Sequence, residues 1–393
     1  MSLCDLDLTD PGFAADPYPR FAALRRVAPV QWHEGRQTWL AFSFEAANSV
    51  LRQRALGRLW SDRTPLDAFA PFNALHRHQM MENEPPEHSR LRRLVASAFS
   101  RGHVERLRPR IAELATGLLD AVDPGGFDAV TDFAEPLPVA MIAELLGVPE
   151  TDRGLLRPWS QAIVAMYEVD CTPEVAGRAV AASAEFADYV SGMVAERRRR
   201  PRADMVSDLV AAQDGPARLT DDEVVASAIL LLNAGHEASV NAFGNGLVAL
   251  LEHPDQMARL VVDPGPLSGA VEELLRFDAP LQLFERTATA DVDVGGVVVT
   301  AGEKVTALLG AANRDPAAFL DPDRLDVGRR AVAHLGFGAG LHFCLGAPLA
   351  RMELDIAWQV LLERFPHLVP GGDARRRPGF VLRGYASVPV AAV

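Results

Sequence analysis

The segment from residue 220 to 252 constrains the fold more than any other part of the chain, because it is a long helix-like stretch with an apolar middle. At about 1.5 Å per residue it would span roughly 48 Å, the width of a whole molecule of this size. Thr220 and Glu223 form a capping box at its start. Residues 224–232 are apolar on nearly all sides, which predicts a fully buried central helix.

The centre of this helix contains residues that a buried helix does not favour. Residues 233–239 read Asn-Ala-Gly-His-Glu-Ala-Ser. Gly235 costs a helix about 1 kcal/mol relative to alanine, and burial of the Glu237 carboxylate costs more unless a partner satisfies it. Gly and Glu in the middle of a core helix therefore indicate a functional site rather than scaffold.

Spaced Leu, Val and Ala residues with charges between them predict further helices, and only short segments have the pattern of strands. The expected helices cover residues 87–100, 103–121, 137–147, 174–200, 268–277 and 346–365. The strand-like parts lie near residues 29–42, 283–308 and 380–392, and Gly295-Gly296 marks a hairpin turn in the second of them. We therefore expect a mainly α protein with a minor β region, forming a single domain over residues 1–393.

Charge and cysteine content exclude several classes of protein. Lys and Arg total 39 against 52 Asp and Glu, a formal net charge of −13, so nucleic-acid binding is not expected. Cys4, Cys171 and Cys344 are too few and too scattered for a disulfide framework. The N-terminal residues lack the pattern of a signal peptide, and no run approaches the ~20 apolar residues of a membrane span. We expect a soluble protein of the cytoplasm.

Two familiar motifs begin in this sequence and are not completed. His236-Glu237 starts like a zinc-protease motif, but position 240 is Val instead of the second His ligand. Gly338 and Gly340 lack the third glycine of a dinucleotide fingerprint, since position 343 is Phe. A Gly-x-Ser-x-Gly elbow does not occur in the sequence. Zinc proteolysis, dinucleotide binding and serine hydrolysis are therefore not predicted.

One motif is complete. Residues 336–351 read GFGAGLHFCLGAPLAR and place a single cysteine between a glycine-rich loop and a helix. Pro348 suits the first turn of that helix, so Cys344 lies near its N-terminus. The helix dipole and the first N–H groups favour the thiolate form of Cys344, which is a good axial metal ligand. The glycines let a flat, bulky group approach the backbone.

The spacing Phe-x-x-Gly-x-x-x-Cys-x-Gly, which runs from Phe337 to Gly346, resembles the haem-binding loop of the cytochrome P-450 superfamily. The resemblance extends from about residue 16 to the end and is to soluble bacterial members that tailor natural products. It implies the P-450 fold, with haem b (iron protoporphyrin IX) between the long central helix and the helix after the cysteine. Cys344 would then be the metal ligand, on the proximal side of the haem iron.

A second match is Glu273-Leu274-Leu275-Arg276, which resembles the Glu-x-x-Arg motif of the same family. Residues three apart on a helix can meet, and arginine offers a bidentate fork to a carboxylate. The resemblance implies that Glu273 and Arg276 form a structural brace that retains haem, with Arg324 as its third member.

The resemblance also implies which residues surround the haem. Cationic or donor side chains would hold its two propionates, and small residues of the long helix would lie beside its face. Besides Phe337, Cys344 and Gly346, the expected haem contacts are His88, Arg92, Arg286 and His342 at the propionates, and Ala234 and Gly235 on the long helix.

Members of this family oxidise substrates with O₂ and two electrons from a partner, and an acid–alcohol pair on the long helix delivers protons. Glu237 matches the acid, but Ala238 replaces the alcohol. Ser239 follows, yet successive helical residues point about 100° apart, so we do not expect Ser239 to replace the missing hydroxyl. Either a substrate hydroxyl, or a water it fixes, completes the relay, or Ala238 merely makes room for a large substrate.

The implied function is that of a cytochrome P-450 monooxygenase, which hydroxylates or epoxidises a lipophilic small molecule from a secondary-metabolite pathway. Polar residues in an apolar lining would offer the substrate at least one hydrogen bond. The expected substrate contacts are Asn233, Leu281, Gln282, Leu283, Val381 and Leu382. One alternative is oxidative coupling or cyclisation without oxygen insertion. A haem-based gas or redox sensor is a further alternative, against which the lack of an output domain argues.

The sequence contains no flavin or nicotinamide motif, so electrons are expected from a ferredoxin and its reductase. Arg92, Arg93 and Arg351 near the cysteine face would receive an acidic partner. Neither nucleic acid nor a membrane is expected as a partner, and the protein is expected to be a monomer.

Overall fold

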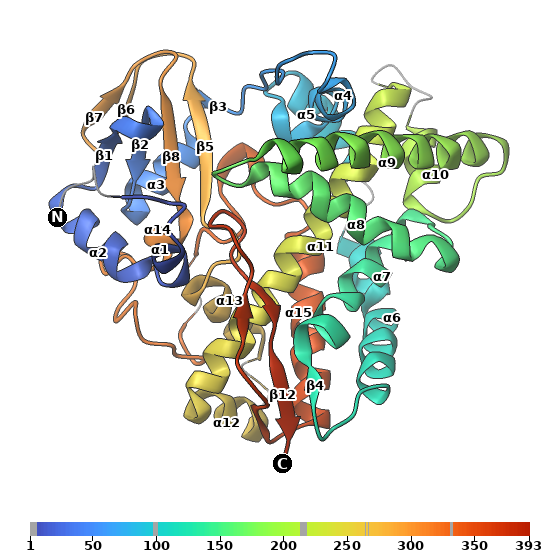
Figure 1. Ribbon diagram of the computed structural model, residues 1–393, viewed down its shortest axis with the longest axis vertical. Helices are drawn as coiled ribbons and strands as arrows, with labels where there is room; N and C mark the ends of the chain where they lie inside the picture. Colours follow the sequence, from blue (N-terminus) through green and yellow to red (C-terminus); the bar gives the residue numbers. More distant parts are fainter. Residues whose placement is uncertain (1–5, 97–100, 213–217, 264, 266, 331–332) are drawn as a thin grey trace. The chain divides into compact units, whose positions relative to one another are not determined.

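The computed structural model of this chain describes residues 6–96, 101–212, 218–263, 265, 267–330 and 333–393 (Figure 1). The chain forms two compact units. Unit 1 comprises residues 1–57, 108–135 and 238–393, and unit 2 comprises residues 58–107 and 136–237. Two helices, α6 (Arg101–Asp120) and α11 (Asp221–Glu252), begin in unit 2 and end in unit 1. The single domain that the sequence suggests stays a prediction.

The main sheet of unit 1 has five strands among the described residues, in the order β1-β2-β8-β5-β3. β1 (Val30–His33) and β2 (Thr38–Ala41) form an antiparallel hairpin, and β2 pairs in parallel with β8 (Lys304–Leu308). β5 (Leu283–Ala288) is antiparallel to β8 and to β3 (Leu56–Gly57). The blue N-terminal strands thus lie beside the orange strands from the 283–308 segment in Figure 1.

Helix α3 (Phe44–Arg52) packs on this sheet and shares its core. Ser43 caps the helix by accepting a hydrogen bond from the Ala46 N–H at 3.2 Å. The buried side of α3 carries Ala46, Ala47, Val50 and Leu51. These residues belong to the same apolar cluster as residues of β1, β2, β5 and β8.

The smaller sheets of unit 1 are short hairpins and edges. β6 (Val292–Val294) and β7 (Val297–Val299) form a hairpin, and its turn residues Gly295 and Gly296 have φ of +61° and +87°. A two-residue hairpin turn of type I′ requires positive φ angles at both of its central residues. The predicted hairpin is therefore confirmed. The other strands are β4 (Phe127–Asp128), β9 (Leu368–Pro370), β10 (Arg375–Arg376), β11 (Tyr385–Ser387) and β12 (Pro389–Ala392).

In unit 1 the C-terminal half of α11 packs against α13 (Leu267–Phe277) and α15 (Ala347–Arg364). The Phe243 and Trp358 rings stack with centroids 4.5 Å apart. A Cβ at Gly246 would lie 3.0 Å from Trp358 Cζ2 and 3.2 Å from Leu274 Cδ1, so the close approach of these helices requires glycine there. The other helices of unit 1 are α1 (Pro11–Ala15), α2 (Tyr18–Val27), α12 (Pro254–Val262), α14 (Leu309–Asn313), the π-helical turn η5 (Ala129–Ala134), and the 3₁₀ turns η2 (Glu34–Arg36) and η8 (Gly340–His342).

Unit 2 is helical apart from its loops, within the residues described. Its longest helix after α11 is α9 (Pro173–Arg199), green in Figure 1, which packs against α4, α8 and α10. Thr172 caps α9 through the Val175 N–H at 3.3 Å. The other elements of unit 2 are α4 (Ala70–Arg77), α5 (Glu87–Ala96), α7 (Pro136–Leu146), α8 (Arg153–Val164), α10 (Met205–Ala211), η3 (Met80–Glu82), η6 (Glu150–Asp152) and η7 (Ala165–Tyr167).

The start of α11 has the capping box that its sequence predicts. The Thr220 N–H donates to Glu223 Oε2 at 2.9 Å, and the Glu223 N–H donates to Thr220 Oγ1 at 3.2 Å. Every residue from Glu223 to Asn233 is buried. The long core helix is therefore confirmed, with its first turn closed by its own side chains.

The predicted mainly α protein with a minor β region is confirmed. Every helix that the sequence predicts is present with ends that differ by only a few residues, although residues 97–100 of one prediction lie outside the described residues. The sequence missed shorter helices such as α2, α3 and α8, because helices of this length depend on tertiary burial rather than on a long periodic pattern. Within the described residues, every helix is too short or too polar to span a membrane.

Candidate functional site

Cys344 lies at the end of a loop whose backbone conformation depends on glycine. Gly338 and Gly340 have φ of +70° and +68°, in the left-handed region. A Cβ at Gly340 would also overlap the Leu51 carbonyl at the end of α3. The loop folds back on itself, and the Cys344 N–H donates to the Phe337 carbonyl at 3.0 Å. These contacts hold Cys344 in one backbone position.

Helix α15 begins directly after this loop. Gly346 is its N-cap, and Pro348 occupies its first turn, as the sequence predicts. The Cys344 carbonyl accepts a hydrogen bond from the Ala347 N–H at 3.5 Å, so the cysteine is attached to the first turn of the helix. The helix dipole and the first N–H groups favour an anion at this end, and therefore the thiolate. A thiolate is a soft ligand that suits iron.

The surface around Cys344 is accessible although it is largely apolar. Residues 341–346 are exposed or half-buried, with Leu341 42% exposed and Phe343 38% exposed. Among the described residues, no three His, Cys, Asp or Glu side chains are grouped so that they could hold a metal ion. A single thiol on an accessible apolar loop therefore fits a metal carried by a flat organic group better than it fits a bare ion.

Arg286 is connected to the cysteine loop through Phe284. Arg286 is 3% exposed, donates to the Glu285 carbonyl at 2.9 Å, and has its guanidinium 5.6 Å from the Phe284 ring centroid. A Cβ at Gly338 would lie 3.5 Å from that same ring. His342 is half-buried in η8, within the loop itself. Two of the predicted propionate contacts therefore lie at or near the loop of Cys344.

The other two predicted propionate contacts, His88 and Arg92, belong to unit 2. They lie four residues apart on α5 and so share one helix face. His88 is 1% exposed and Arg92 is half-buried. Arg90 between them has a different role, because it forms an ion pair with Glu223 in the capping box of α11. This ion pair attaches α5 to the start of α11 within unit 2.

Helix α11 continues through its polar centre without a break. Gly235 lies against α7, where a Cβ would be 3.7 Å from Ile142 Cδ1. Ala234 is exposed, in contrast to the buried stretch that precedes it. Glu237 is 6% exposed, and its Oε1 lies 3.4 Å from His236 Nδ1. An accessible small residue and a buried acid therefore lie one helical turn apart.

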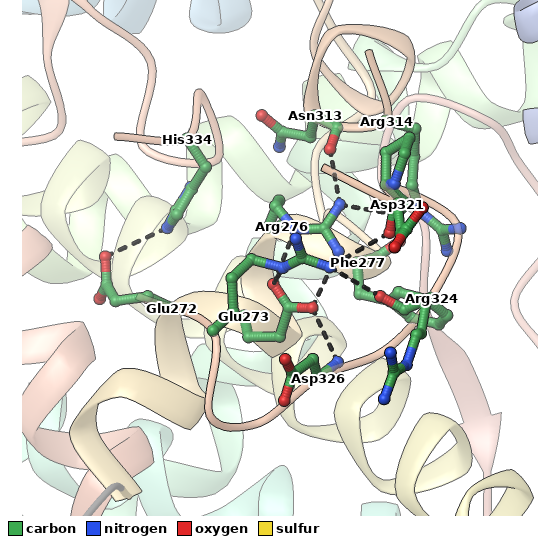
Figure 2. Close-up of polar contacts among 12 residues, drawn as sticks. Glu272, Glu273, Arg276, Phe277, Asn313, Arg314, Asp321, Arg324, Asp326 and His334 are labelled. Carbon is green, nitrogen blue, oxygen red and sulfur yellow. Dashed lines mark hydrogen bonds and ion pairs between the residues drawn. The ribbon is translucent and has the colours of Figure 1, made fainter. Parts of the chain in front are cut away.

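Glu273 and Arg276 of α13 form the buried ion pair that the Glu-x-x-Arg spacing predicts (Figure 2). Arg276 donates through Nε at 2.7 Å and Nη2 at 2.9 Å to the two carboxylate oxygens. Its Nη1 donates to the carbonyls of Asn313 and Pro322, at 2.8 and 2.9 Å. Asn313 Oδ1 in turn accepts from the Leu335 N–H at 2.8 Å. The pair thus connects α13 to the start of the cysteine loop.

The third member of this brace is Arg329, and the sequence prediction of Arg324 is wrong. Arg329 Nε donates to Glu273 Oε2 at 3.0 Å. Arg324 is exposed and contributes only its backbone carbonyl, which accepts from Arg329 Nη2 at 3.0 Å (Figure 2). The reason is a turn in the chain, where Asp321 has a φ of +45° and the Arg324 side chain is directed to solvent. The Asp326 N–H then donates to Glu273 at 3.0 Å, which brings the following residues to the carboxylate.

The two segments expected to line the substrate site lie side by side in unit 1. Leu281 forms an antiparallel β-bridge with Leu382, and the Gln282 N–H donates to the Val381 carbonyl at 2.9 Å. Leu281, Leu382 and Leu283 are half-buried. The structure therefore brings these apolar residues together, and their role as substrate contacts stays a prediction.

Gln282 is the exception, because it is fully buried and the NH₂ group of its amide is used within the fold. The side chain is fully buried, and its Nε2 donates to the Ala279 carbonyl at 2.8 Å and to the Tyr18 hydroxyl at 3.4 Å. A buried amide has to find partners wherever the fold offers them. Its Oε1 has no hydrogen-bond partner among the described residues, so the expectation that Gln282 supplies a substrate hydrogen bond stays a prediction.

Sequence reasoning missed a second cluster beside the cysteine loop, formed by Glu272, His334 and Arg351. Arg351 donates to Glu272 through Nε at 2.6 Å and Nη2 at 2.9 Å, so it is not a simple solvated cation for an acidic partner. Nothing in the spacing of these residues connects them. The one signal in the sequence is that Glu272 directly precedes the Glu-x-x-Arg motif.

Glu353 on α15 is a further buried carboxyl group that the sequence does not single out. It is 6% exposed and has no hydrogen-bond or ion-pair partner among the described residues. Burial raises the pKa of Glu353 from 4.5 to about 8. The folded protein therefore keeps this proton over a pH range in which the unfolded chain loses it, and stability falls as the pH rises through that range.

Replacing Glu353 by glutamine is expected to stabilise the protein at alkaline pH. The gain in the free energy of unfolding should be absent at pH 4 and reach as much as about 4 kcal/mol above pH 8, because glutamine cannot ionise. Urea unfolding of both proteins between pH 4 and pH 9 measures the difference. Glu363→Gln, at an exposed position of the same helix, is the matched control. Parallel stability profiles for Glu353→Gln and the wild type would contradict the prediction.

The chain is similar to known proteins over nearly its whole length. A family model described as "Cytochrome P450" matches residues 156–262 and 267–384. The chain is 42% identical to cytochrome P450 monooxygenase PikC of Streptomyces venezuelae, over 98% of this chain and 93% of that protein. It is 40% identical to 6-deoxyerythronolide B hydroxylase of Saccharopolyspora erythraea, over 98% of both proteins.

Solved structures show the same similarity at the level of the fold. One is the crystal structure of P450BioI in complex with hexadec-9Z-enoic acid ligated acyl carrier protein. Its TM-score with the present structure is 0.93 at 34% sequence identity, and the match covers 97% of this chain and 100% of that chain.

Proposed function

Because this chain belongs to the cytochrome P450 family and is a monooxygenase with a haem-iron cofactor, we propose that it hydroxylates or epoxidises a lipophilic intermediate of a secondary-metabolite pathway. The observation that carries this proposal is the position of Cys344, in a complete glycine-rich loop at the N-terminus of α15. One relative is named as a monooxygenase and another as a hydroxylase, which supports oxygen insertion as the reaction.

The proposed haem contacts follow from the chemistry of the residues described above. Haem, when bound, supplies the iron at which O₂ is activated. Cys344 would hold that iron through its thiolate, and the buried guanidinium of Arg286 provides the positive charge that a propionate needs. The proposed propionate contacts are Arg286 and His342 in unit 1 and His88 and Arg92 in unit 2, and the backbone contacts are Phe337 and Gly346 in unit 1 and Ala234 and Gly235 in unit 2.

Glu237 is proposed to hold the proton that the reaction consumes. Its carboxylate is buried on α11, where the following Ala238 has no hydroxyl with which to pass a proton on. Ser239 is half-buried but lies a further 100° or so around the helix. We therefore propose that a substrate hydroxyl, or a water molecule that it fixes, completes the relay from Glu237. Turnover would then depend on the substrate that supplies this group.

The Ala238→Thr variant is expected to activate O₂ without the help of the substrate. A relay hydroxyl from the protein should raise oxygen consumption on non-native compounds by at least about 10-fold, because a positioned proton donor contributes 10²-fold or more to rate. Oxygen uptake and product yield are measured together, so that uncoupled turnover is visible. Ala242→Thr adds the same hydroxyl one helical turn later and should have no such effect. Full wild-type activity on compounds without any hydrogen-bonding group would refute the substrate-assisted relay.

Asn233 is proposed as a substrate contact. It is 7% exposed, and its Oδ1 has no hydrogen-bond partner among the described residues. A buried amide oxygen without a partner costs the folded protein about 1–3 kcal/mol of free energy. A ligand that donates a hydrogen bond to this oxygen removes that cost, which favours binding. The half-buried pair Leu281 and Leu382 offers an apolar contact. Asn233 favours a substrate that carries a hydrogen-bond donor, and the apolar pair in unit 1 favours one that is lipophilic.

The experiment that tests this function is reconstitution with a ferredoxin, its reductase and a panel of lipophilic metabolites. Compounds that bind beside the haem would shift its absorbance, and those compounds are then tested for turnover. A product heavier by one oxygen atom supports the proposed monooxygenation. A product that has only lost hydrogens supports the alternative of oxidative coupling or cyclisation, and would overturn the proposal.

A ferredoxin is the proposed electron source. Arg351 is engaged with Glu272, whereas Arg93 of α5 is exposed, so Arg93 is proposed to receive an acidic partner. Electron transfer should therefore slow as ionic strength rises. The chain is further proposed to act as a monomer, which sedimentation analysis tests directly.

A further inference from the structure

We propose that Glu272 is a positioning residue that clamps both ends of the Cys344 loop, through His334 before the loop and Arg351 after it. The inference rests on the proposed function, in which Cys344 holds the haem iron. Glu272 directly precedes Glu273 of the brace, and the proposed role is separate from that of the brace. Since consecutive helical residues point about 100° apart, Glu272 and Glu273 reach different partners from adjacent positions on α13.

The clamp consists of hydrogen bonds to both carboxylate oxygens of Glu272. Arg351, in the second turn of α15, donates through Nε to Oε1 at 2.6 Å and through Nη2 to Oε2 at 2.9 Å. His334 Nε2 lies 3.2 Å from Oε2, and Figure 2 marks this contact between His334 and Glu272 with a dashed line. Burial alone would raise the pKa of Glu272, but the hydrogen bonds from His334 and Arg351 lower it to about 2. The carboxylate therefore stays ionised, and both partners donate to a charge.

His334 passes this contact to the backbone of the loop. The Gly336 N–H donates to His334 Nδ1 at 2.9 Å, so Nδ1 acts as an acceptor and the ring proton is on Nε2, where it faces Glu272. A Cβ at position 336 would lie 2.9 Å from Nδ1 and displace the ring. The next residue is Phe337, whose carbonyl accepts the Cys344 N–H at 3.0 Å. Contacts therefore connect Glu272 on α13, through His334 and the 336–337 backbone, to Cys344.

Arg351 fixes the same loop from the other side. Its guanidinium lies 4.3 Å from the Phe337 ring centroid, and the Phe337 and His334 rings have centroids 5.9 Å apart. Phe337 is thus held by both partners of Glu272. Its backbone carbonyl orients Cys344, so loss of the clamp would free the loop that directs the thiolate. Groups that orient a metal ligand in this way strengthen its bond to the metal.

The Glu272→Gln variant tests this role because glutamine keeps the size of the side chain and removes its charge. We expect the amides of Gly336 and Cys344 to exchange hydrogen about 10-fold faster than in the wild type. We also expect the ferrous carbonyl adduct to lose its thiolate-type spectrum about 10-fold faster during incubation. Glu363→Gln, at an exposed position at the far end of α15, should match the wild type in both measurements.

The outcomes separate this inference from the proposed function. If the wild-type protein itself shows no thiolate-type carbonyl spectrum, the assignment of Cys344 as the iron ligand fails. The positioning role of Glu272 then fails with it. If the wild type shows that spectrum and Glu272→Gln keeps wild-type rates of exchange and of thiolate loss, the positioning role alone is overturned. A lower unfolding midpoint in Glu272→Gln with an unchanged rate of thiolate loss would also overturn it, because the residue would then be merely structural.

Discussion

The Cys344→Ser variant is expected to lose the thiolate-type spectrum of its ferrous carbonyl adduct and at least about two orders of magnitude of monooxygenase turnover. Loss of an outer partner of a metal ligand already costs roughly 10–100-fold, and Cys344 is proposed as the ligand itself. A serine hydroxyl at the N-terminus of α15 is a harder donor and does not supply the electron density of a thiolate. The loop should keep its shape, since the hydrogen bond to Phe337 uses the backbone N–H.

The matched control for this prediction is Cys171→Ser. Cys171 precedes α9 in unit 2, and its thiol donates to Met166 Sδ at 3.1 Å and to the Thr172 carbonyl at 3.7 Å. This variant should retain both the spectrum and the turnover of the wild type. A thiolate-type spectrum that survives in Cys344→Ser would show that another group holds the iron.

Replacing Arg276 by methionine is expected to lower the free energy of unfolding by about 3–5 kcal/mol, as loss of one partner of a buried ion pair generally does. Methionine keeps an unbranched apolar stem but removes the guanidinium, so the Glu273 carboxylate, which is 3% exposed, has one partner fewer. The carbonyls of Asn313 and Pro322 lose their donor at the same time. Because Arg329 remains bonded to Glu273, the lower end of this range is expected. Urea unfolding of the haem-loaded protein measures the effect.

Arg110→Met is the control for burial. Arg110 also forms an ion pair with a glutamate three residues away, Glu113, but the two side chains are 36% and 71% exposed. Its loss should change the free energy of unfolding by less than about 1 kcal/mol. Arg324→Met should be equally mild, whereas Arg329→Met should destabilise the protein. Similar effects of Arg276→Met and Arg110→Met would contradict the assignment of a buried brace.

The features that the sequence predicted correctly are those that depend on neighbours in the chain. The capping box of Thr220 and Glu223 is closed by two residues within one turn, and the turn at Gly295-Gly296 needs only the backbone freedom of glycine. The position of Cys344 before α15 follows in the same way from a loop and a helix start that are adjacent in sequence. Local geometry of this kind is determined by residues that are adjacent in sequence, so it can be predicted without knowledge of the fold.

Periodicity was sufficient for the long helices and insufficient for the short ones. The 32-residue helix α11 has a pattern that no other element could satisfy. By contrast α3, with 9 residues, is stable because four of its residues are buried against the sheet. A helix this short has little stability of its own, so it forms only when it packs against other parts of the chain. Those parts cannot be identified from the sequence of the helix itself.

Partners distant in the chain were decided by the tertiary structure alone. The spacing around Glu273 predicted Arg276, but the turn at Asp321 directs Arg324 to solvent and brings Arg329 to the carboxylate instead. Glu272 meets His334 and Arg351 across 62 and 79 residues of sequence. Local spacing carries no information about such pairs, because the position of each side chain depends on how whole helices and loops pack. The sequence by itself therefore determined the cysteine and the helix that follows it, and only the packed chain decided which side chains hold that cysteine in place.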